Sequence, residues 1–308
     1  MEAMSIERRI QLALGFTALT VLAELIGGWW AHSLALLSDA AHVFMDLFAM
    51  GLTLVALHLS TRPATPTKSY GYHRAEIFAA LINGMTLLAL SAWIGYEAIH
   101  RLLAPQAVKS LAVVIVAGGG LLVNVCVLRT LRVGTHTDLN LHSAYWHVLS
   151  DALASIGVVL GAVVIALTGW NAVDSLVSLL IIGLIAIGAV RILNDSTHIL
   201  LEGVPKGLSL DLVADTLRKV AGVRDVHHLH ILSLCSNVYA LSSHVRVHDT
   251  HLGGLSPLLE AINASLREKF NISHTTIQFE YEECAEEGLL QPIPHTDRHR
   301  EGSDSHSQ

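Results

Sequence analysis

Six apolar stretches, each about 20 residues long, follow one another through the first 200 residues of this chain and restrict its fold more than any other feature. A helix needs about 20 apolar residues to cross the hydrocarbon core of a bilayer, because each residue advances it by about 1.5 Å. With 52% hydrophobic and only 15% charged residues, the 308-residue chain is too apolar for a soluble protein. We therefore predict an α-helical polytopic membrane protein with six transmembrane helices in residues 1–200. The predicted spans are residues 10–30, 34–59, 77–99, 111–128, 141–167 and 173–190.

The first apolar stretch could instead be a signal peptide. It is longer than the apolar core of a typical signal, ends in Trp29 and Trp30, and lacks a small-residue cleavage pattern. We therefore interpret it as a first helix that the protein retains.

Lysine and arginine lie mainly on one side of the predicted spans. The N-terminal segment, the second and fourth loops and the exit of the last helix hold eight of them, whereas the opposite side holds only Arg101 and Lys109. Cytoplasmic loops carry the excess of these residues near helix ends, so an even number of spans predicts that both termini are cytoplasmic. The net charge of −7 does not indicate nucleic acid binding, and we expect no nucleic acid partner.

Two of the predicted spans contain a histidine four residues before an aspartate. These pairs are His42 with Asp46 and His147 with Asp151. A four-residue step places both side chains of a pair on one helix face, so two facing helices would present two imidazoles and two carboxylates. Four nitrogen and oxygen ligands of this kind suit a tetrahedral divalent metal ion, zinc first.

The same pairs could be structural hydrogen bonds. An aspartate in the centre of a membrane helix costs about 2.5 to 3.5 kcal/mol on insertion scales, and a His-Asp hydrogen bond could compensate one pair. The repetition of one spacing on two separate helices is harder to explain in that way. A metal ion would offset the charge of both carboxylates directly, and we favour a metal site formed by His42, Asp46, His147 and Asp151. Asp39 shares the helix face of His42 and belongs either to an access path or to the membrane interface.

The composition changes after Leu201, where Pro205, Gly207 and regularly spaced charges replace the apolar pattern. Residues 201–284 are sufficient for a small independent domain. Their pattern predicts a compact α+β domain with two helices on one sheet face, and the polar segment 285–308 is predicted to be disordered. The predicted elements are a helix at 209–221, strands at 225–234 and 238–248, a helix at 255–270 and a strand at 274–282.

This second domain is rich in histidine. Single histidines on strands are usually exposed or paired with another polar group, but adjacent strands can bring several together as a zinc-binding surface. The residues alone leave both interpretations open.

Four segments of the chain resemble the cation diffusion facilitator family, and within it the bacterial zinc exporters. They are Leu37–His42 with Asp46, Ser69–Glu76, His147–Asp151 and His227–His230. The resemblance extends from Ile6 to Cys284. It implies a homodimer in the inner membrane of a bacterium that exports cytoplasmic divalent metal, zinc first and with cadmium, cobalt or nickel as further candidates, in exchange for protons.

The resemblance also implies two metal sites. The transport site of the family lies between the second and fifth helices, which corresponds to His42, Asp46, His147 and Asp151 here. The cytosolic domain of the family resembles a metallochaperone and binds zinc as a structural or regulatory ligand. By motif position this second site corresponds to His227, His244 and Glu280, with His274 as a further candidate.

Elementary metal chemistry agrees with proton antiport. A ligand histidine must be neutral and a ligand aspartate ionised to hold a metal ion, so protons and metal compete for the same atoms. Two alternatives come from other functional classes: an intramembrane zinc metalloenzyme and a membrane-anchored metal sensor. The chain lacks the H-E-x-x-H motif of zinc proteases, and a sensor leaves the intramembrane pairs unexplained.

Overall fold

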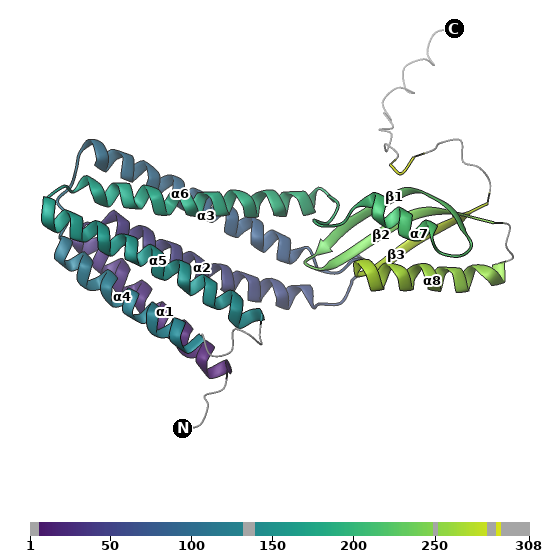
Figure 1. Cartoon of the computed structure of the whole chain (residues 1–308), viewed down its shortest axis with the longest axis horizontal. Helices are drawn as coiled ribbons and strands as arrows, with labels where there is room; N and C mark the ends of the chain where they lie inside the picture. Colours follow the sequence, from purple (N-terminus) through teal and green to yellow (C-terminus); the bar gives the residue numbers. More distant parts are fainter. Residues whose placement is uncertain (1–5, 132–138, 249–251, 282–287, 291–308) are drawn as a thin grey trace, which may run out of the picture. The chain divides into compact units, whose positions relative to one another are not determined.

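The computed structural model describes residues 6–131, 139–248, 252–281 and 288–290. It divides into two compact units, Met1–Thr197 and His198–Gln308. The first unit is helical throughout its described elements, and the second contains a small sheet (Figure 1).

Six long helices make up the first unit. They are α1 (Ile6–Ala31), α2 (Leu34–Ser60), α3 (Ala75–Leu103), α4 (Ser110–Leu131), α5 (Leu139–Thr168) and α6 (Ala172–Leu200). Helices α2 to α6 are long and apolar enough to span a membrane, and the apolar stretch Gly15–Ala31 of α1 is shorter. Large apolar side chains such as Leu54, Trp93 and Leu180 are exposed on this unit, as expected for surfaces that contact lipid.

The helices extend beyond several of the predicted spans. Helix α6, for example, continues to Leu200, ten residues beyond the predicted end at Val190. The prediction followed hydropathy, which drops at Arg191 and Asp195, whereas the backbone hydrogen bonds of a helix continue through polar residues.

Within the first unit, α2 occupies a central position. It packs against α1, α3 and α5, and α4 packs against both α1 and α5. Helices α3 and α6 lie side by side (Figure 1), where Gly84 of α3 leaves room for Leu193 and Ile192 of α6. Met45 of α2 and Leu87 of α3 share a buried apolar cluster with Ala189 of α6, which joins the three helices.

The start of α2 is fixed by a carboxylate from a different helix. The Asp174 carboxylate of α6 accepts hydrogen bonds from Ser33 Oγ (2.6 Å), Leu34 N (2.5 Å) and Ala35 N (3.4 Å). Amide groups in the first turn of a helix have no partner within the helix, and a carboxylate also interacts favourably with the positive end of its dipole. Asp174 therefore sets the position of α2 relative to α6.

The second unit is an α+β domain, as predicted. Its elements are α7 (Leu210–Arg218), β1 (Val223–Cys235), β2 (Val238–Val247), α8 (Leu252–Phe270) and β3 (Ile272–Glu280). The sheet order is β1-β2-β3, with β1 and β2 antiparallel and β2 and β3 parallel. A buried core that includes Val213, Leu217, Ile262, Leu266 and Val245 joins both helices to the sheet.

An irregularity interrupts β1 at its histidines. The pairing with β2 shifts register between His227 and His230, and His228 adopts a φ of 47°. The backbone amides of His228 and Leu229 donate to the carbonyls of Gly288 (3.4 Å) and Leu289 (2.9 Å). Of the segment predicted to be disordered, 285–308, residues 288–290 are thus placed against β1, and the other positions lie outside the described residues.

Candidate metal centres

Helices α2 and α5 bring the two His-Asp pairs together. His42 Nε2 lies 3.8 Å from Asp46 Oδ2 and 3.9 Å from Asp151 Oδ1. His147 Nε2 lies 3.4 Å from Asp46 Oδ2 and 3.7 Å from Asp151 Oδ2. Each imidazole therefore contacts the carboxylate of its own helix and that of the neighbouring helix.

These separations are close to those of a zinc site. Ligand atoms about 2.0 Å from a tetrahedral zinc ion lie about 3.3 Å from one another. The nitrogen–oxygen separations of 3.4 to 3.9 Å need only a small contraction to reach that value. One possible ligand atom from each of His42, Asp46 and Asp151 also lies within 4.8 Å of those of the other two residues.

Polar atoms in this group are buried without hydrogen bonds. In the described part of the chain, Asp46 Oδ2, Asp151 Oδ1 and His42 Nδ1 have no hydrogen-bond partner. The Asp151 side chain is only 7% exposed, whereas that of His147 is 50% exposed. Two carboxylates that face each other in an apolar environment repel, so the arrangement favours a bound cation.

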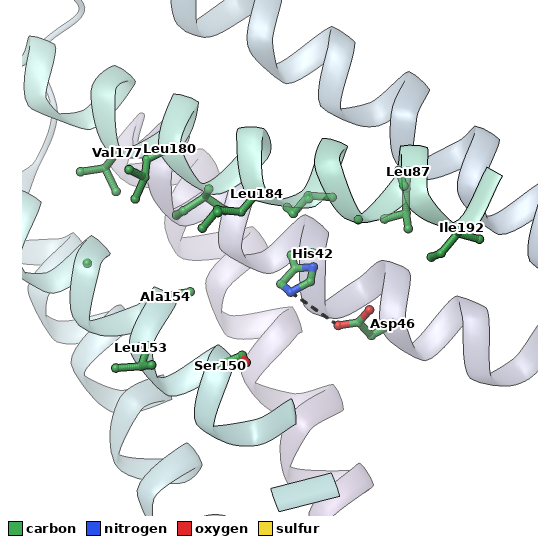
Figure 2. A pocket seen from close by; sticks show the side chains of 15 residues that line it. His42, Asp46, Leu87, Ser150, Leu153, Ala154, Val177, Leu180, Leu184 and Ile192 are labelled. Atoms are coloured by element: carbon green, nitrogen blue, oxygen red, sulfur yellow. Dashed lines mark ion pairs between the residues drawn. The ribbon is translucent and has the colours of Figure 1, made fainter. Parts of the chain in front are cut away.

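A cavity of about 550 Å³ leads to the group. It is lined by His42 and Asp46 of α2, Leu87 of α3, and apolar residues of α5 and α6. Figure 2 shows His42 and Asp46 on α2 beside this space, with Ser150 and Ala154 of α5 and Leu184 of α6 around it. The other lining residues are apolar except Ser150, so His42 and Asp46 are the side chains of this cavity that offer metal ligands.

A second group of ligand-type side chains lies on the sheet of the other unit. His227 Nε2 lies 3.0 Å from Glu280 Oε2, and His244 Nδ1 lies 2.8 Å from Glu280 Oε1. His227 pairs directly with His244 across β1 and β2, and Glu280 pairs with Arg246 across β2 and β3. The register of the sheet therefore brings one residue from each strand together.

His228 joins this group, which the sequence prediction did not include. The ring centres of His228 and His244 are 4.6 Å apart, and those of His228 and His227 are 5.0 Å apart. Neighbouring residues of a regular strand point to opposite faces, but the register shift and positive φ turn His228 towards His227. In the sequence, the place of His228 in this group was indicated only by its position directly after His227.

His274 lies elsewhere on the sheet. It is exposed and pairs with Ala240, six positions before Glu280 on β3. Six residues of strand span about 20 Å, which separates His274 from the group formed by His227, His228, His244 and Glu280.

The environment of the second group shifts two of its pKa values. Burial lowers the pKa of His227, and the neighbouring His228, His244 and Arg246 act in the same direction, although Glu280 opposes them. Burial opposes ionisation of Glu280, but a hydrogen bond from Gln278 and the charges of His244 and His227 keep its pKa below the ordinary value. A neutral imidazole and an ionised carboxylate are the forms that bind metal.

Comparison with protein families accounts for almost the whole described chain. A family model described as the cation efflux transmembrane domain matches residues 10–201. A second model, described as the cytoplasmic domain of cation efflux proteins, matches residues 205–282. The two matches meet near the boundary between the two structural units.

Similar proteins with curated names extend over nearly the full chain. The metal cation efflux system protein CzcD of Cupriavidus metallidurans is 39% identical over 286 residues, 92% of this chain and 90% of that protein. The zinc transporter ZitB of Yersinia pestis is 35% identical over 95% of this chain and 94% of its own. A Bacillus subtilis protein named cadmium, cobalt and zinc/H(+)-K(+) antiporter is 35% identical, with 94% of each chain covered. The solved metal-bound C-terminal domain of CzcD is 36% identical over 24% of this chain and 99% of that chain, with a TM-score of 0.22.

Proposed function

Since the chain belongs to the cation efflux family of membrane transporters, we propose that it exports divalent metal ions, zinc first, from the cytoplasm in exchange for protons. Family membership makes the protein a multi-pass metal efflux transporter rather than an enzyme. The alternative of an intramembrane zinc metalloenzyme is therefore wrong, and the sensor alternative has no support.

The observation that carries the proposal is the meeting of four ligand-type side chains between α2 and α5. His42, Asp46, His147 and Asp151 are its transport site. Two imidazoles and two carboxylates offer both charge neutralisation and a tetrahedral set of donors. Imidazole nitrogen favours zinc, cobalt, nickel and similar ions over manganese and magnesium, which prefer oxygen. The named substrates of the relatives, zinc, cadmium and cobalt, agree with this preference.

Proton exchange follows from the acid–base chemistry of the same donors. The site holds metal only when both imidazoles are neutral and both carboxylates ionised. On the side of the membrane with more protons, protonation competes with metal and favours its release. The Bacillus subtilis relative is named an antiporter of cadmium, cobalt and zinc with H(+) and K(+), which supports exchange of metal for protons.

The protein is also proposed to be a homodimer with a defined orientation in the membrane. Both termini are cytoplasmic, as the distribution of Lys and Arg indicates. The match to a family of cytoplasmic domains named for dimerisation supports a homodimer. His227, His228, His244 and Glu280 form a zinc site in the cytoplasmic domain, and His274 is not one of its ligands.

Zinc uptake by inside-out membrane vesicles tests the proposed function. We expect vesicles that contain the protein and have an acidic lumen to accumulate zinc, and collapse of the pH gradient with an ionophore to stop uptake. Vesicles that contain the Asp46→Asn variant at equal expression are the control. Equal zinc uptake with and without the pH gradient would contradict proton coupling, and equal uptake by the variant would contradict the transport site.

A further inference from the structure

A second group of acidic side chains is buried beside the transport site but outside the cavity that leads to it. Its members are Glu24 of α1 and Asp39 of α2, which are 2% and 1% exposed. Neither residue lines the cavity beside His42 and Asp46. A buried carboxylate is costly unless its charge is paired or removed, so both residues require an explanation.

Asp39 is only partly satisfied by hydrogen bonds. Ser155 Oγ of α5 donates to Asp39 Oδ2 at 3.0 Å, and Ser155 is itself buried. The other oxygen, Asp39 Oδ1, is buried and has no hydrogen-bond partner among the described residues. A buried carboxylate oxygen without a hydrogen-bond donor is stabilised when it binds either a proton or a cation.

Glu24 lies where α1 closely approaches α4. A Cβ atom on Gly120 of α4 would lie 2.5 Å from Glu24 Oε1 and 3.1 Å from Thr20 Cγ2, so glycine leaves the space that this carboxylate needs. Asp39 and Asp151 lie near enough to Glu24 for their charges to act on it. Asp39 in turn interacts with the charge of Asp151 on α5 and with His42 on its own helix.

The position of this pair relates it to both the transport site and one end of the bundle. Asp39 is three residues from His42, towards the N-terminal end of α2. Ser155 is four residues from Asp151, on the same face of α5. The pair therefore lies next to the transport site, on the side that the proposed orientation places away from the cytoplasm.

The donors of the pair suit a proton better than a metal ion. All are oxygens, which makes them a poor match for zinc beside a site that offers two imidazoles. An alkali ion needs a shell of several oxygens, whereas the described side chains here supply two carboxylates and one hydroxyl. A proton needs only one free oxygen, and Asp39 Oδ1 is such an atom.

We propose that Glu24 and Asp39 form a proton-binding pair, beside the metal ligands but not among them, through which the counter-transported proton passes before it competes with metal at those ligands. The inference rests on the proposed function, because it gives the proton of the antiport a route to the transport site. A proton that binds at Asp39 Oδ1 converts the carboxylate to a carboxylic acid and removes one negative charge next to the transport site. Loss of that charge weakens the attraction for a divalent cation at Asp151 and His42, so proton binding promotes metal release.

Reconstituted full-length protein allows two transport modes to be compared in the same vesicles. One is zinc uptake driven by a pH gradient, and the other is exchange of labelled for unlabelled zinc at equal pH on both sides. Only the first mode requires net proton movement. The variants Asp39→Asn and Glu24→Gln keep the shape of each side chain but cannot carry the charge.

For each variant we expect gradient-driven uptake to fall by about tenfold or more, while zinc exchange measured at saturating zinc, where a weaker affinity does not limit it, stays within about twofold of the unmodified protein. Glu97→Gln is the matched control, because Glu97 is a carboxylate of α3 that is paired with Arg101 at 2.8 Å, outside this group. It should leave both modes unchanged.

Three results would overturn the inference. Gradient-driven uptake that survives both substitutions would show that the pair does not carry the proton. An equal loss of exchange in both variants would show that the pair supports the fold or the metal ligands instead. Uptake that is driven by a potassium gradient at equal pH, and lost in Asp39→Asn, would assign the pair to an alkali ion. Failure of the unmodified protein in both modes would instead reject the proposed export function.

Discussion

His147 Nε2 on α5 lies 3.4 Å from Asp46 Oδ2 on α2, closer than its 3.7 Å separation from Asp151 Oδ2 on its own helix. The imidazole of one helix is thus nearer to the carboxylate of the other. A transported ion at this position would be shared between α2 and α5, and a relative movement of these helices would change all its contacts together. Replacement of a single ligand should therefore disturb contacts made by both helices.

Removal of either carboxylate should abolish transport. Asp46→Asn and Asp151→Asn each keep the side-chain volume but remove an anionic ligand, and we expect zinc transport to fall by about 100-fold or more. Uptake by vesicles, normalised to the amount of folded protein, measures this loss. Ser150→Ala is the control because Ser150 lines the same cavity, yet its hydroxyl bonds to the Trp146 carbonyl. Normal uptake by either aspartate variant would contradict the site.

Exchange of one imidazole for a carboxylate should relax metal selectivity. His42→Asp replaces a nitrogen donor by oxygen, which favours harder ions such as manganese. We expect the ratio of zinc to manganese transport to fall by about tenfold, as measured with both metals in competition. His58→Asp introduces the same charge at an exposed position of α2 and should not change the ratio. An unchanged metal profile in His42→Asp would exclude this histidine as a selectivity determinant.

The cytoplasmic site should depend on His228 but not on His274. In full-length protein that carries Asp46→Asn, which removes one anionic ligand of the proposed transport site, we expect His228→Ala to weaken zinc binding to the cytoplasmic domain by about 10-fold or more. His274→Ala should bind zinc normally, because His274 is six positions from Glu280 on β3. Calorimetric titration measures both variants. The assignment fails if the His228 and His274 variants have equal affinities.

The carboxylate of Asp174 should stabilise the membrane unit through the first turn of α2. Asp174→Ala leaves the amides of Leu34 and Ala35 and the hydroxyl of Ser33 without this acceptor. We expect a loss of about 2 kcal/mol, the upper range for a helix cap. Thermal unfolding in detergent measures the change. Ser178→Ala is the control, since its hydroxyl bonds within its own helix to the Asp174 carbonyl, and it should cost much less.

The metal-free cytoplasmic domain should lose stability as the pH falls below 6.5. Burial lowers the pKa of His227 below its ordinary value of 6.5. Between the two values the unfolded state binds more protons than the folded state, so stability is fully present above pH 6.5 and is lost as the pH falls towards the folded-state pKa. The lowered pKa of Glu280 adds a loss of the same sign at more acidic pH.

Labelling of the buried Cys235 thiol in urea can follow this unfolding in the full-length chain, with the other two cysteines replaced by serine. We expect labelling to occur at lower urea as the pH falls from 7.5 to below 6.5. His227→Gln should reduce this dependence, because glutamine does not titrate. A pH dependence that is equal in the variant would show that another group is responsible.

Much of the membrane unit could be predicted because its signals are local. An apolar stretch of sufficient length forms a helix in lipid, whatever its neighbours, since every backbone polar group must be satisfied within the segment. The four-residue spacing likewise fixed which side chains share a helix face. The ends of α6 could not be predicted in this way, because hydropathy marks contact with lipid rather than the end of a helix.

The cytoplasmic group shows where local reasoning was insufficient. His227, His244 and Glu280 were predicted from motif position, and the sheet register brings them together. The place of His228 depends on a shift in strand register and a positive φ, which result from pairing with β2 and from backbone contacts with Gly288 and Leu289. Such contacts join residues far apart in the sequence and leave little trace in the local pattern.

The sequence by itself determined the helices, their apolar surfaces and the two His-Asp pairs, because these properties depend on spacing within one segment. Only the tertiary structure decided that α2 and α5 lie with those pairs facing each other, that Asp174 holds the start of α2, and that Glu24 and Asp39 are buried near the same site. These relationships arise from packing between helices, where small residues such as Gly120 decide how closely two helices approach.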